Sequence, residues 1–260
     1  MTFDIEEFDW PAERGRPLSP TAEMDVTEEG TGHVLQLLAR HGTLATFFIT
    51  AAFARARPER VRAIVEAGHE AAVHGLAHSD DYGTMDAAVA LERLRESRAV
   101  IEAISARPAR GVRTPRLRPC APTVLRDAGF VYDASPHPTW VPGRYNGLTW
   151  PRRPWREAGV VRIPISVLPL IRVPVSWIWY RTAGPCAGII AAGAACLGAP
   201  YLHVYFHAWE AVDIRPLGIP RIFALRTGAS FLRALDPLLA WASTRMVPMT
   251  VGEFVRGLGQ

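Results

Sequence analysis

The sequence predicts an α/β fold, either a (β/α) barrel or a doubly wound sheet. Short apolar segments rich in β-branched and aromatic residues, such as Leu44 to Ile49, alternate with longer segments of helical periodicity. These short segments have the pattern of strands buried on both faces, which is typical of parallel sheets. At 260 residues the chain can bury a sizeable core, and we expect a single domain over residues 1–260.

The first elements follow from local patterns near the N-terminus. Phe3 and Ile5 alternate with polar residues, as in a short strand. The proline-rich residues 10–26 are expected to form a loop. Thr27 has the hydroxyl of a helix N-cap, and the helix after it should end at Gly42. The expected apolar face of this helix consists of Val34, Leu37 and Leu38.

The next elements are a strand, a helix and another strand. Residues 44–49 form a continuous apolar run, as in a buried strand. Pro58 opens a second helix, because proline is favoured in the first helical turn, and Gly68 ends it. Residues 69–74 should form the following strand, and residues 84–105 a long amphipathic helix.

The second half of the chain continues the alternation with shorter elements. Strands are expected near residue 112 and at 130–132, 160–165 and 203–207, and helices at 122–128 and 222–242, before an apolar segment at 247–251 closes the chain. We find no internal repeat or low-complexity segment. This order of elements supports the barrel or the doubly wound sheet over an all-α or all-β fold.

Composition excludes several classes of function. All 29 basic residues are Arg, so chemistry that requires a lysine Schiff base or a Walker-type lysine is excluded. The net charge of +4 is scattered, and no basic strip interleaved with aromatic residues predicts nucleic-acid binding. Cys120, Cys186 and Cys196 contain no CxxC pair, which argues against a disulfide framework and a thiolate zinc site. With no signal peptide visible, we expect a reducing, cytoplasmic location.

Candidate metal ligands occur at three separate places in the chain. His74 and His78 are four residues apart, so on a helical turn both imidazoles would lie on one side. An acidic cluster that includes Asp4 and Glu6 lies near the N-terminus, and His207 follows a late apolar run. A carboxylate, two histidines and a further histidine are the parts of a metal-dependent hydrolase.

These residues also share a position relative to the expected strands. Active groups of barrels and doubly wound sheets sit at the carboxyl ends of parallel strands. Six candidate residues lie at predicted strand ends: Asp4, Glu6, His74, Arg113, Asp133 and His207. This coincidence is a stronger indication of a site than any single motif.

Several segments, in the right order, resemble the motifs of the polysaccharide deacetylases with NodB homology. The quoted segments are Thr2-Phe3-Asp4, Ala45-Thr46-Phe47-Phe48-Ile49, Ala67-Gly68-His69-Glu70, His74-Gly75-Leu76-Ala77-His78, Gly111-Val112-Arg113-Thr114-Pro115, Tyr132-Asp133-Ala134-Ser135 and Tyr205-Phe206-His207-Ala208-Trp209-Glu210. The last resembles the branch with an HPWE motif, with Ala208 in the proline position. The resemblance covers about residues 1 to 210 and implies an irregular (β/α) barrel of about seven strands.

The resemblance also implies roles for individual residues. It makes Asp4 the general base, oriented by Arg113, and makes His207, on the opposite side of the site, the acid that protonates the leaving amine. The metal ligands would be Glu6, His74 and His78. Asp133 would be either a turn cap or a partner of His207.

The first motif departs from the commonest family pattern, which has two adjacent aspartates. Here Asp4-Ile5 is followed by Glu6-Glu7, and Glu7 competes with Glu6 for the metal. Glu6 shares a strand face with Asp4 and Glu7 does not, which favours Glu6. In the second motif Gly75 replaces the usual Ser or Thr, and the D-W pair of the fourth motif is not clearly present. His203, four residues before His207, is expected to be a core histidine.

The implied chemistry is hydrolysis of an acetamide. The donor set makes zinc the default metal, and iron, cobalt or nickel would fit the same ligands. A backbone N–H near Pro115–Arg116 is expected to stabilise the oxyanion. By resemblance the substrate is an N-acetyl amino sugar, either free, lipid-linked or attached to a metabolite, and the products are acetate and a free amine.

An uncharged segment leaves two structural alternatives. Residues 182–202 carry no charge over a length that could cross a bilayer. The interruptions at Pro185 and Pro200 favour a helix of the barrel. Peripheral contact with a membrane through residues 166–202 is the alternative, and the residues that suggest it are Arg172, Trp177, Trp179, Tyr180 and Arg181.

Two other functions share the expected barrel. One is an amidohydrolase acting on cyclic imides or ureides, a branch that often lacks the full metal set. The other is a catalytically silent carbohydrate-binding barrel. Retention of both His74 and His78 argues against the first, and retention of Asp4 together with His207 argues against the second. The sequence gives no indication of the oligomeric state.

Overall fold

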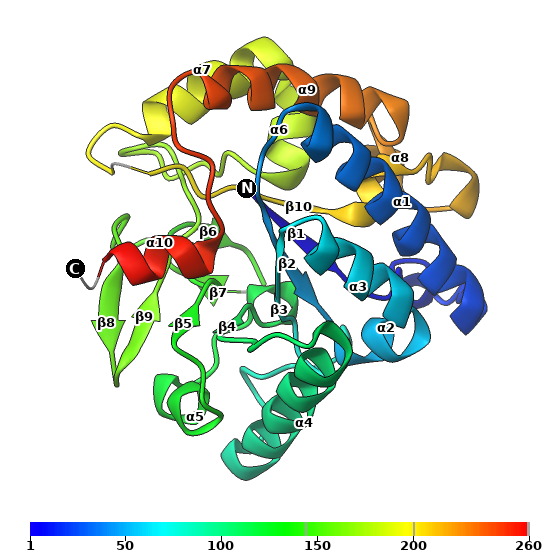
Figure 1. Ribbon diagram of the computed structural model, residues 1–260. Helices are drawn as coiled ribbons and strands as arrows, with labels where there is room; N and C mark the ends of the chain where they lie inside the picture. Colours follow the sequence, from blue (N-terminus) through cyan, green and yellow to red (C-terminus); the bar gives the residue numbers. More distant parts are fainter. Residues whose placement is uncertain (144, 200, 259–260) are drawn as a thin grey trace.

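A curled, mostly parallel sheet surrounded by helices forms the core of the protein (Figure 1). The computed structural model describes residues 1–143, 145–199 and 201–258. Within these residues the main sheet has eight strands in the order β10-β1-β2-β3-β4-β5-β9-β8. All neighbours in it are parallel except β8 and β9. The α/β class and the barrel-like curvature expected from the sequence are confirmed, in the form of a half-barrel.

The bounds of the elements are as follows. The strands are β1 (Thr2–Ile5), β2 (Thr46–Ile49), β3 (Glu70–Val73), β4 (Gly111–Val112), β5 (Tyr132–Asp133), β6 (Trp140–Val141), β7 (Tyr145–Asn146), β8 (Trp155–Glu157), β9 (Val160–Arg162) and β10 (Tyr205–His207). The α-helices are α1 (Pro20–Arg40), α2 (Ala51–Ala56), α3 (Pro58–Glu66), α4 (Ala87–Ser105), α5 (Pro122–Asp127), α6 (Trp177–Ala183), α7 (Pro185–Ala195), α8 (Arg221–Ala224), α9 (Ala229–Ser243) and α10 (Val251–Gly257). Four 3-10 helices complete the fold: η1 (Ala12–Arg14), η2 (Pro115–Leu117), η3 (Ala208–Ala211) and η4 (Arg215–Leu217).

Two apolar layers hold the sheet in place. The outer layer lies between the sheet and helices such as α1 and α4, where Phe3, Phe47 and Phe206 are fully buried. A second cluster includes Phe48 and Tyr132 together with residues of α10. The first turn of α10 also donates backbone hydrogen bonds to side chains at the first residues of β2 and β3. Helix α10 therefore covers the amino ends of the strands and leaves their carboxyl ends for a site.

The two sides of the half-barrel are joined by the segments next to β9 and β10. The backbone N–H of Ser166 donates to the carbonyl oxygen of His203 at 2.8 Å, and the N–H of His203 donates to the Ser166 hydroxyl at 2.9 Å. This contact lies outside the ladder of the main sheet. It brings the segment after β9 against the segment before β10 and so completes the curvature.

Helix α1 begins earlier than the sequence pattern predicts. Ser19 caps it and Pro20 occupies its first turn, so the expected loop at residues 10–26 is too long by about two turns of helix. Thr27 lies inside the helix, and its hydroxyl donates to the backbone carbonyl of Glu6 at 2.7 Å. The Thr27 hydroxyl therefore does not cap the helix; it holds the backbone in place just after β1.

The other differences concern short elements. The sequence pattern missed α2, β8 and the β6–β7 hairpin, because elements of two to six residues have too little periodicity to detect. The helix expected at 222–242 is two helices, α8 and α9, separated by Gly228, whose φ is +65°. The segment at 247–251 pairs with no strand of the described sheet and leads into α10.

The uncharged segment forms helix α7, as the barrel alternative predicts. No helix in the described ranges combines the length and the apolar character needed to span a bilayer. Tyr180 and Arg181, two of the residues that suggested membrane contact, are buried, with 1% and 0% of their surface exposed.

Candidate active site

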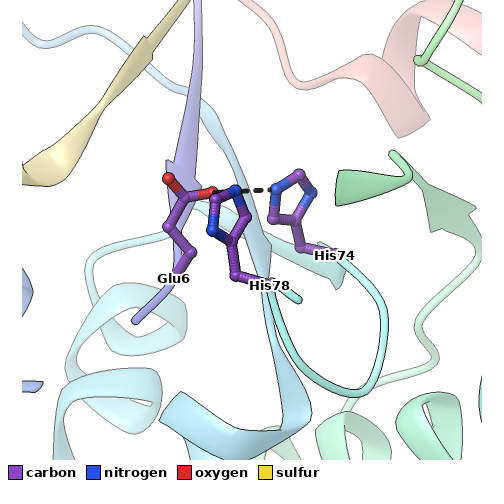
Figure 2. Close-up of side chains that lie close together, drawn as sticks. All are labelled: Glu6, His74 and His78. Atoms are coloured by element: carbon purple, nitrogen blue, oxygen red, sulfur yellow. Dashed lines mark hydrogen bonds and ion pairs between the residues drawn. The ribbon is translucent and has the colours of Figure 1, made fainter. Parts of the chain in front are cut away.

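Three potential metal ligands converge at the carboxyl ends of β1 and β3 (Figure 2). The Oε2 atom of Glu6 lies 3.1 Å from Nε2 of His74 and 3.2 Å from Nε2 of His78. One donor atom from each residue lies within 4.8 Å of the others. All three residues are buried, so the donors face one another in a region shielded from water.

His78 reaches this centre from a loop rather than from a helix. The expectation of one helical turn across residues 74–78 is wrong, because the chain leaves β3 in a bend and a turn. Gly75 makes the bend possible: its φ is +87°, and a Cβ atom there would lie 2.9 Å from Tyr82 and 3.1 Å from Pro115. The imidazoles of His74 and His78 end up nearly parallel, with an angle of 18° between the rings. A serine or threonine does not fit at residue 75 without moving these neighbours.

Each imidazole is oriented by a hydrogen bond from its other nitrogen. Nδ1 of His74 lies 2.8 Å from the backbone carbonyl oxygen of Arg113, and Nδ1 of His78 lies 2.8 Å from Oδ1 of Asp9. Donation from Nδ1–H leaves the Nε2 lone pair of each ring directed at the centre, which is the usual arrangement of histidine metal ligands. Two imidazoles and one carboxylate fit a divalent cation such as zinc, with open positions for water and substrate.

The charges at the centre favour a cation. Burial alone raises the pKa of the Glu6 carboxyl, but the imidazoles of His78, His207 and His74 outweigh it, and the pKa lies well below its usual range. Burial lowers the pKa of His78, but the carboxylates of Glu6 and Asp9 outweigh burial and raise this pKa above its usual value, to about 9. The site therefore stabilises positive charge, either as a proton on an imidazole or as a bound metal ion.

Glu7, the competitor of Glu6, points away from the centre. Its Oε2 accepts a hydrogen bond from the Thr50 hydroxyl at 2.6 Å, and its Oε1 accepts one from the backbone N–H of His78 at 3.3 Å. Glu7 thus supports the histidine loop from behind. The structure brings Glu6, and not Glu7, to the two imidazoles, as the strand alternation predicts.

Substitution of the two glutamates should separate these positions. We expect Glu6→Ala to lose most of the bound metal, because it removes the only carboxylate of the donor set. Glu7→Ala should keep most of it, with a loss of no more than about the 10–100-fold in affinity that is typical of supporting groups. Metal content of the purified variants, measured by mass spectrometry, checks the prediction. The opposite order of metal loss would show that the carboxylate assignment is wrong.

Asp4 forms a buried ion pair with Arg113 beside the metal centre. Nη1 of Arg113 donates to Oδ1 of Asp4 at 2.6 Å, and both side chains are almost fully buried. Nη2 donates to the hydroxyl of Thr2 at 2.8 Å, and the guanidinium lies 4.2 Å from the centre of the Phe48 ring. With this many partners Arg113 is rigid, so it can hold the Asp4 carboxylate in one orientation.

His203 helps to hold the Arg113 side chain in place. Its Nε2 lies 2.8 Å from Nη2 of Arg113, and its Nδ1 lies 3.2 Å from the carbonyl oxygen of Pro164. Burial and the positive charge of Arg113 hold the pKa of His203 well below its usual range. A neutral imidazole therefore accepts from Arg113 through Nε2. This geometry agrees with the core position expected for His203.

His207 lies on the strand next to Asp4 rather than across the site from it. The two residues are register partners in the parallel β1–β10 pair. Nε2 of His207 lies 3.9 Å from Oε1 of Glu6, so the imidazole also borders the metal centre. The expectation of opposite sides is wrong, because β10 is the neighbour of β1 in the sheet.

The carboxylate that holds His207 is Glu210. Oε1 of Glu210 accepts a hydrogen bond from the backbone N–H of His207 at 2.8 Å and lies 3.3 Å from its Nδ1. Its Oε2 accepts from Nε of Arg181, and both of these side chains have no exposed surface. Burial lowers the pKa of His207, but the charges of Glu6 and Glu210 raise it above its usual value.

Asp133 fits one of its two expected roles, the turn cap, and also forms an ion pair that was not expected. Its Oδ2 lies 3.1 Å from Nε of Arg162, and its Oδ1 accepts hydrogen bonds from the backbone and the hydroxyl of Ser135. The structure therefore supports the turn-cap alternative over pairing with His207. The physical reason is the sheet order, which places Asp133 on β5, opposite Arg162 on β9.

Aromatic side chains line the cavity above these groups. The cavity has a volume of about 270 Å³ and contains Asp4, Glu6, His74, His78 and His207 in its wall. Its aromatic wall consists of Trp10, Trp140, Tyr145, Trp177, Trp179, Tyr205 and Phe223. Arg116 also borders it, with a φ of +53°, near the backbone expected to donate to an oxyanion. That donor role stays a prediction.

Sequence reasoning missed three supporting residues. Asp9 orients His78, Trp209 donates from its indole Nε1 to Oε1 of Glu6 at 3.2 Å, and Glu210 holds His207. The role of Glu210 could have been predicted from its spacing. A carboxylate three residues after His207 can accept a hydrogen bond from the His207 backbone N–H. The role of Asp9 could not have been predicted from its spacing, because its contact with His78 depends on the fold.

Comparison with known proteins agrees with the sequence resemblance. The family model for polysaccharide deacetylase matches residues 20–132. A chitooligosaccharide deacetylase of Sinorhizobium fredii is 36% identical over 85 residues, which are 33% of this chain and 40% of that protein. Another of Bradyrhizobium sp. is 33% identical over 142 residues, 55% of this chain and 60% of that protein. These matches cover less than two thirds of the curated relatives.

Solved structures share the whole fold. A putative polysaccharide deacetylase from Mycobacterium smegmatis aligns with a TM-score of 0.67 at 18% sequence identity, covering 100% of this chain and 88% of that one. A probable polysaccharide deacetylase from Pseudomonas aeruginosa PAO1 aligns with a TM-score of 0.69 at 17% identity, covering 98% and 88%. At this level of identity the structural likeness establishes the fold alone.

Proposed function

Because part of the chain is similar in sequence to polysaccharide deacetylases, we propose that it is a metal-dependent de-N-acetylase of an N-acetyl amino sugar. The reaction hydrolyses the acetamide to acetate and a free amine. The observation that carries the proposal is the convergence of Glu6, His74 and His78 next to Asp4 and His207 in the wall of one cavity. Binding alone does not require a buried base and a buried imidazole beside a cation site.

The contacts of each group allow a specific role in the hydrolysis. Glu6, His74 and His78 would hold a divalent ion, which would supply a polarising charge for the acetamide carbonyl and lower the pKa of a bound water. Asp4, held by Arg113, accepts the proton of the attacking water. His207, held by Glu210, donates a proton to the departing amine nitrogen. The charges of Glu6 and Glu210 raise the pKa of His207 and so favour its protonated form.

The cavity suits one amino sugar residue. A volume of about 270 Å³ is at the small end of ligand pockets, so it favours a single sugar ring over several. Tryptophan and tyrosine rings in the wall offer apolar faces to the C–H groups of a sugar, while their N–H and O–H groups can bind its hydroxyls. Zinc is our proposed native metal, on the strength of the nitrogen and oxygen donors.

Acetate release tests the proposed reaction. The full chain, loaded with Zn²⁺, is incubated with soluble N-acetylated chito-oligosaccharides, and acetate and free amine are both measured. We expect the two products in equal amounts. Binding of the sugars without acetate release would instead support the catalytically silent barrel, and release of a ring-opened product from a cyclic ureide would support the amidohydrolase alternative.

Location is a separate part of the proposal. We place the enzyme in the cytosol, which is supported by the free thiols of Cys120, Cys186 and Cys196 within the described structure. Peripheral membrane contact through residues 166–202 is a separate proposal that does not depend on the deacetylase function. Since Tyr180 and Arg181 are buried, this contact depends on the exposed side chains of the segment.

A further inference from the structure

One part of the chain combines exposed apolar side chains with neighbouring arginines. Between Glu157 and Glu210 the sequence contains no Asp or Glu. Five large apolar side chains in this stretch are exposed: Leu170 by 96%, Ile171 by 68%, Trp179 by 50%, Ile190 by 74% and Leu197 by 65%. Together with Arg152, Arg153 and Arg172, these five side chains define what we call the 150–198 face.

Hydrogen bonds link the arginines of the 150–198 face to its apolar elements. Arg152 donates to the carbonyl oxygens of residues 195 and 197 at 2.7 and 3.1 Å, at the carboxyl end of α7. Arg153 donates to the next carbonyl along the chain, that of Gly198, at 2.5 Å. Arg172, beside the exposed Leu170 and Ile171, donates to the carbonyl of Trp150 at 3.0 Å. The arginines therefore lie next to exposed apolar groups rather than elsewhere on the surface.

Helix α7 forms the central part of the 150–198 face. It lies at the periphery of the molecule beside α9 (Figure 1). Its inner side packs through Gly188, where a Cβ atom would lie 2.3 Å from the Tyr180 ring, and through the buried Ala192. Its outer side carries the exposed Ile190 and no charged residue. A helix that is apolar on its outer side as well as its inner side is expected to contact a partner.

We propose that the 150–198 face docks onto the surface of an anionic lipid bilayer. Aliphatic and tryptophan side chains can enter the interfacial region, while arginines next to them bind lipid phosphates. The lack of acidic residues between Glu157 and Glu210 reduces repulsion from anionic headgroups. A second copy of the chain is a poorer occupant, because a twofold contact would place arginines against arginines, and the stretch between Glu157 and Glu210 supplies no carboxylate to pair them.

Docking of the 150–198 face would place the opening of the cavity next to the membrane surface. Trp179 belongs to the 150–198 face and also lines the cavity, so the cavity opens at the edge of the docked surface. An amino sugar carried on a membrane lipid could then enter the cavity while its lipid stays in the bilayer. This substrate class rests on the proposed deacetylase function, whereas the docking itself does not.

Vesicle binding of the full chain tests the docking. The probes are vesicles of phosphatidylglycerol and phosphatidylcholine in equal parts, and vesicles of phosphatidylcholine alone, in a flotation assay at low salt. We expect the protein to float with the anionic vesicles at least about tenfold more than with the neutral ones. Ile190→Glu should lower anionic binding by about tenfold or more, because it puts a like charge into the apolar part of the face. Val247→Glu is the matched control, since Val247 is 76% exposed and lies outside the face.

The outcomes separate the docking from the proposed function. Unchanged acetate release from soluble chito-oligosaccharides by Ile190→Glu, with lost vesicle binding, supports the docking. Equal vesicle binding by wild type and Ile190→Glu overturns it, as does a dimer in solution that Ile190→Glu dissociates. Vesicle binding through this face by a protein that releases no acetate would leave the docking in place and overturn the deacetylase function instead.

Discussion

His74→Ala and His78→Ala are each expected to lose the bound metal and acetate release together. Each imidazole supplies one of only three donor groups, and its Nε2 lies within 3.2 Å of the Glu6 carboxylate. Loss of a ligand should lower metal affinity by more than the roughly 10–100-fold that is typical for loss of a supporting group. Metal content after dialysis and the initial rate of acetate release measure the two effects.

Two controls define the cause of this loss. His41→Ala removes an imidazole that binds Asp236 far along the chain, so it should keep both metal and activity. Asp9→Asn keeps both ligands but weakens the hydrogen bond that orients His78. Its metal content and rate of acetate release should therefore lie between those of wild type and His78→Ala. Far-ultraviolet circular dichroism should be unchanged in all four variants. Full metal occupancy in both ligand variants would end the assignment of this centre.

His207→Ala is expected to lower kcat by about 10²- to 10⁴-fold while leaving the metal in place. The imidazole borders the centre but is not among the three converging donors. If His207 acts as the acid, it works in its protonated form, so activity falls as pH rises through its pKa. The variant should therefore lose the alkaline limb of the pH profile.

Glu210→Gln tests whether the charge behind His207 matters for turnover; because it also removes the ion-pair partner of the buried Arg181, its melting temperature is measured beside kcat. The substitution keeps the shape of the side chain and an oxygen that can accept from His207, but it removes the negative charge behind the imidazole. We expect a smaller fall in kcat than for His207→Ala, with little change in KM. Near-normal kcat and a lowered melting temperature in His207→Ala would instead identify a structural histidine.

Residues with local signals were placed correctly by the sequence alone. The apolar runs of β1 and β2 and the proline at the start of α3 depend on a few neighbouring residues, and the structure confirms them. Strand alternation also separates Glu6 from Glu7, because it depends only on the extended backbone of β1. The structure brings together the metal-ligand candidates inferred in this way, and their roles stay predictions.

The features that the sequence could not give depend on contacts between distant segments. Asp133 pairs with Arg162 because β5 lies beside β9, and that strand order is not visible in either segment. The loop between His74 and His78 bends because Gly75 packs against Tyr82 and Pro115, although the spacing also suits a helix. Local spacing therefore predicted which residues meet but not the backbone that brings them together.

Titration of the metal-free full chain with Zn²⁺, followed by acetate release from N-acetylated chito-oligosaccharides, tests the central claim most directly. If Glu6, His74 and His78 form one metal site that the reaction requires, the rate should rise in proportion to added Zn²⁺ and level off at about one equivalent per chain. A chelator should abolish the rate, and His74→Ala should show no rise at one equivalent. Acetate release at the full rate from metal-free protein in the presence of the chelator would contradict the account.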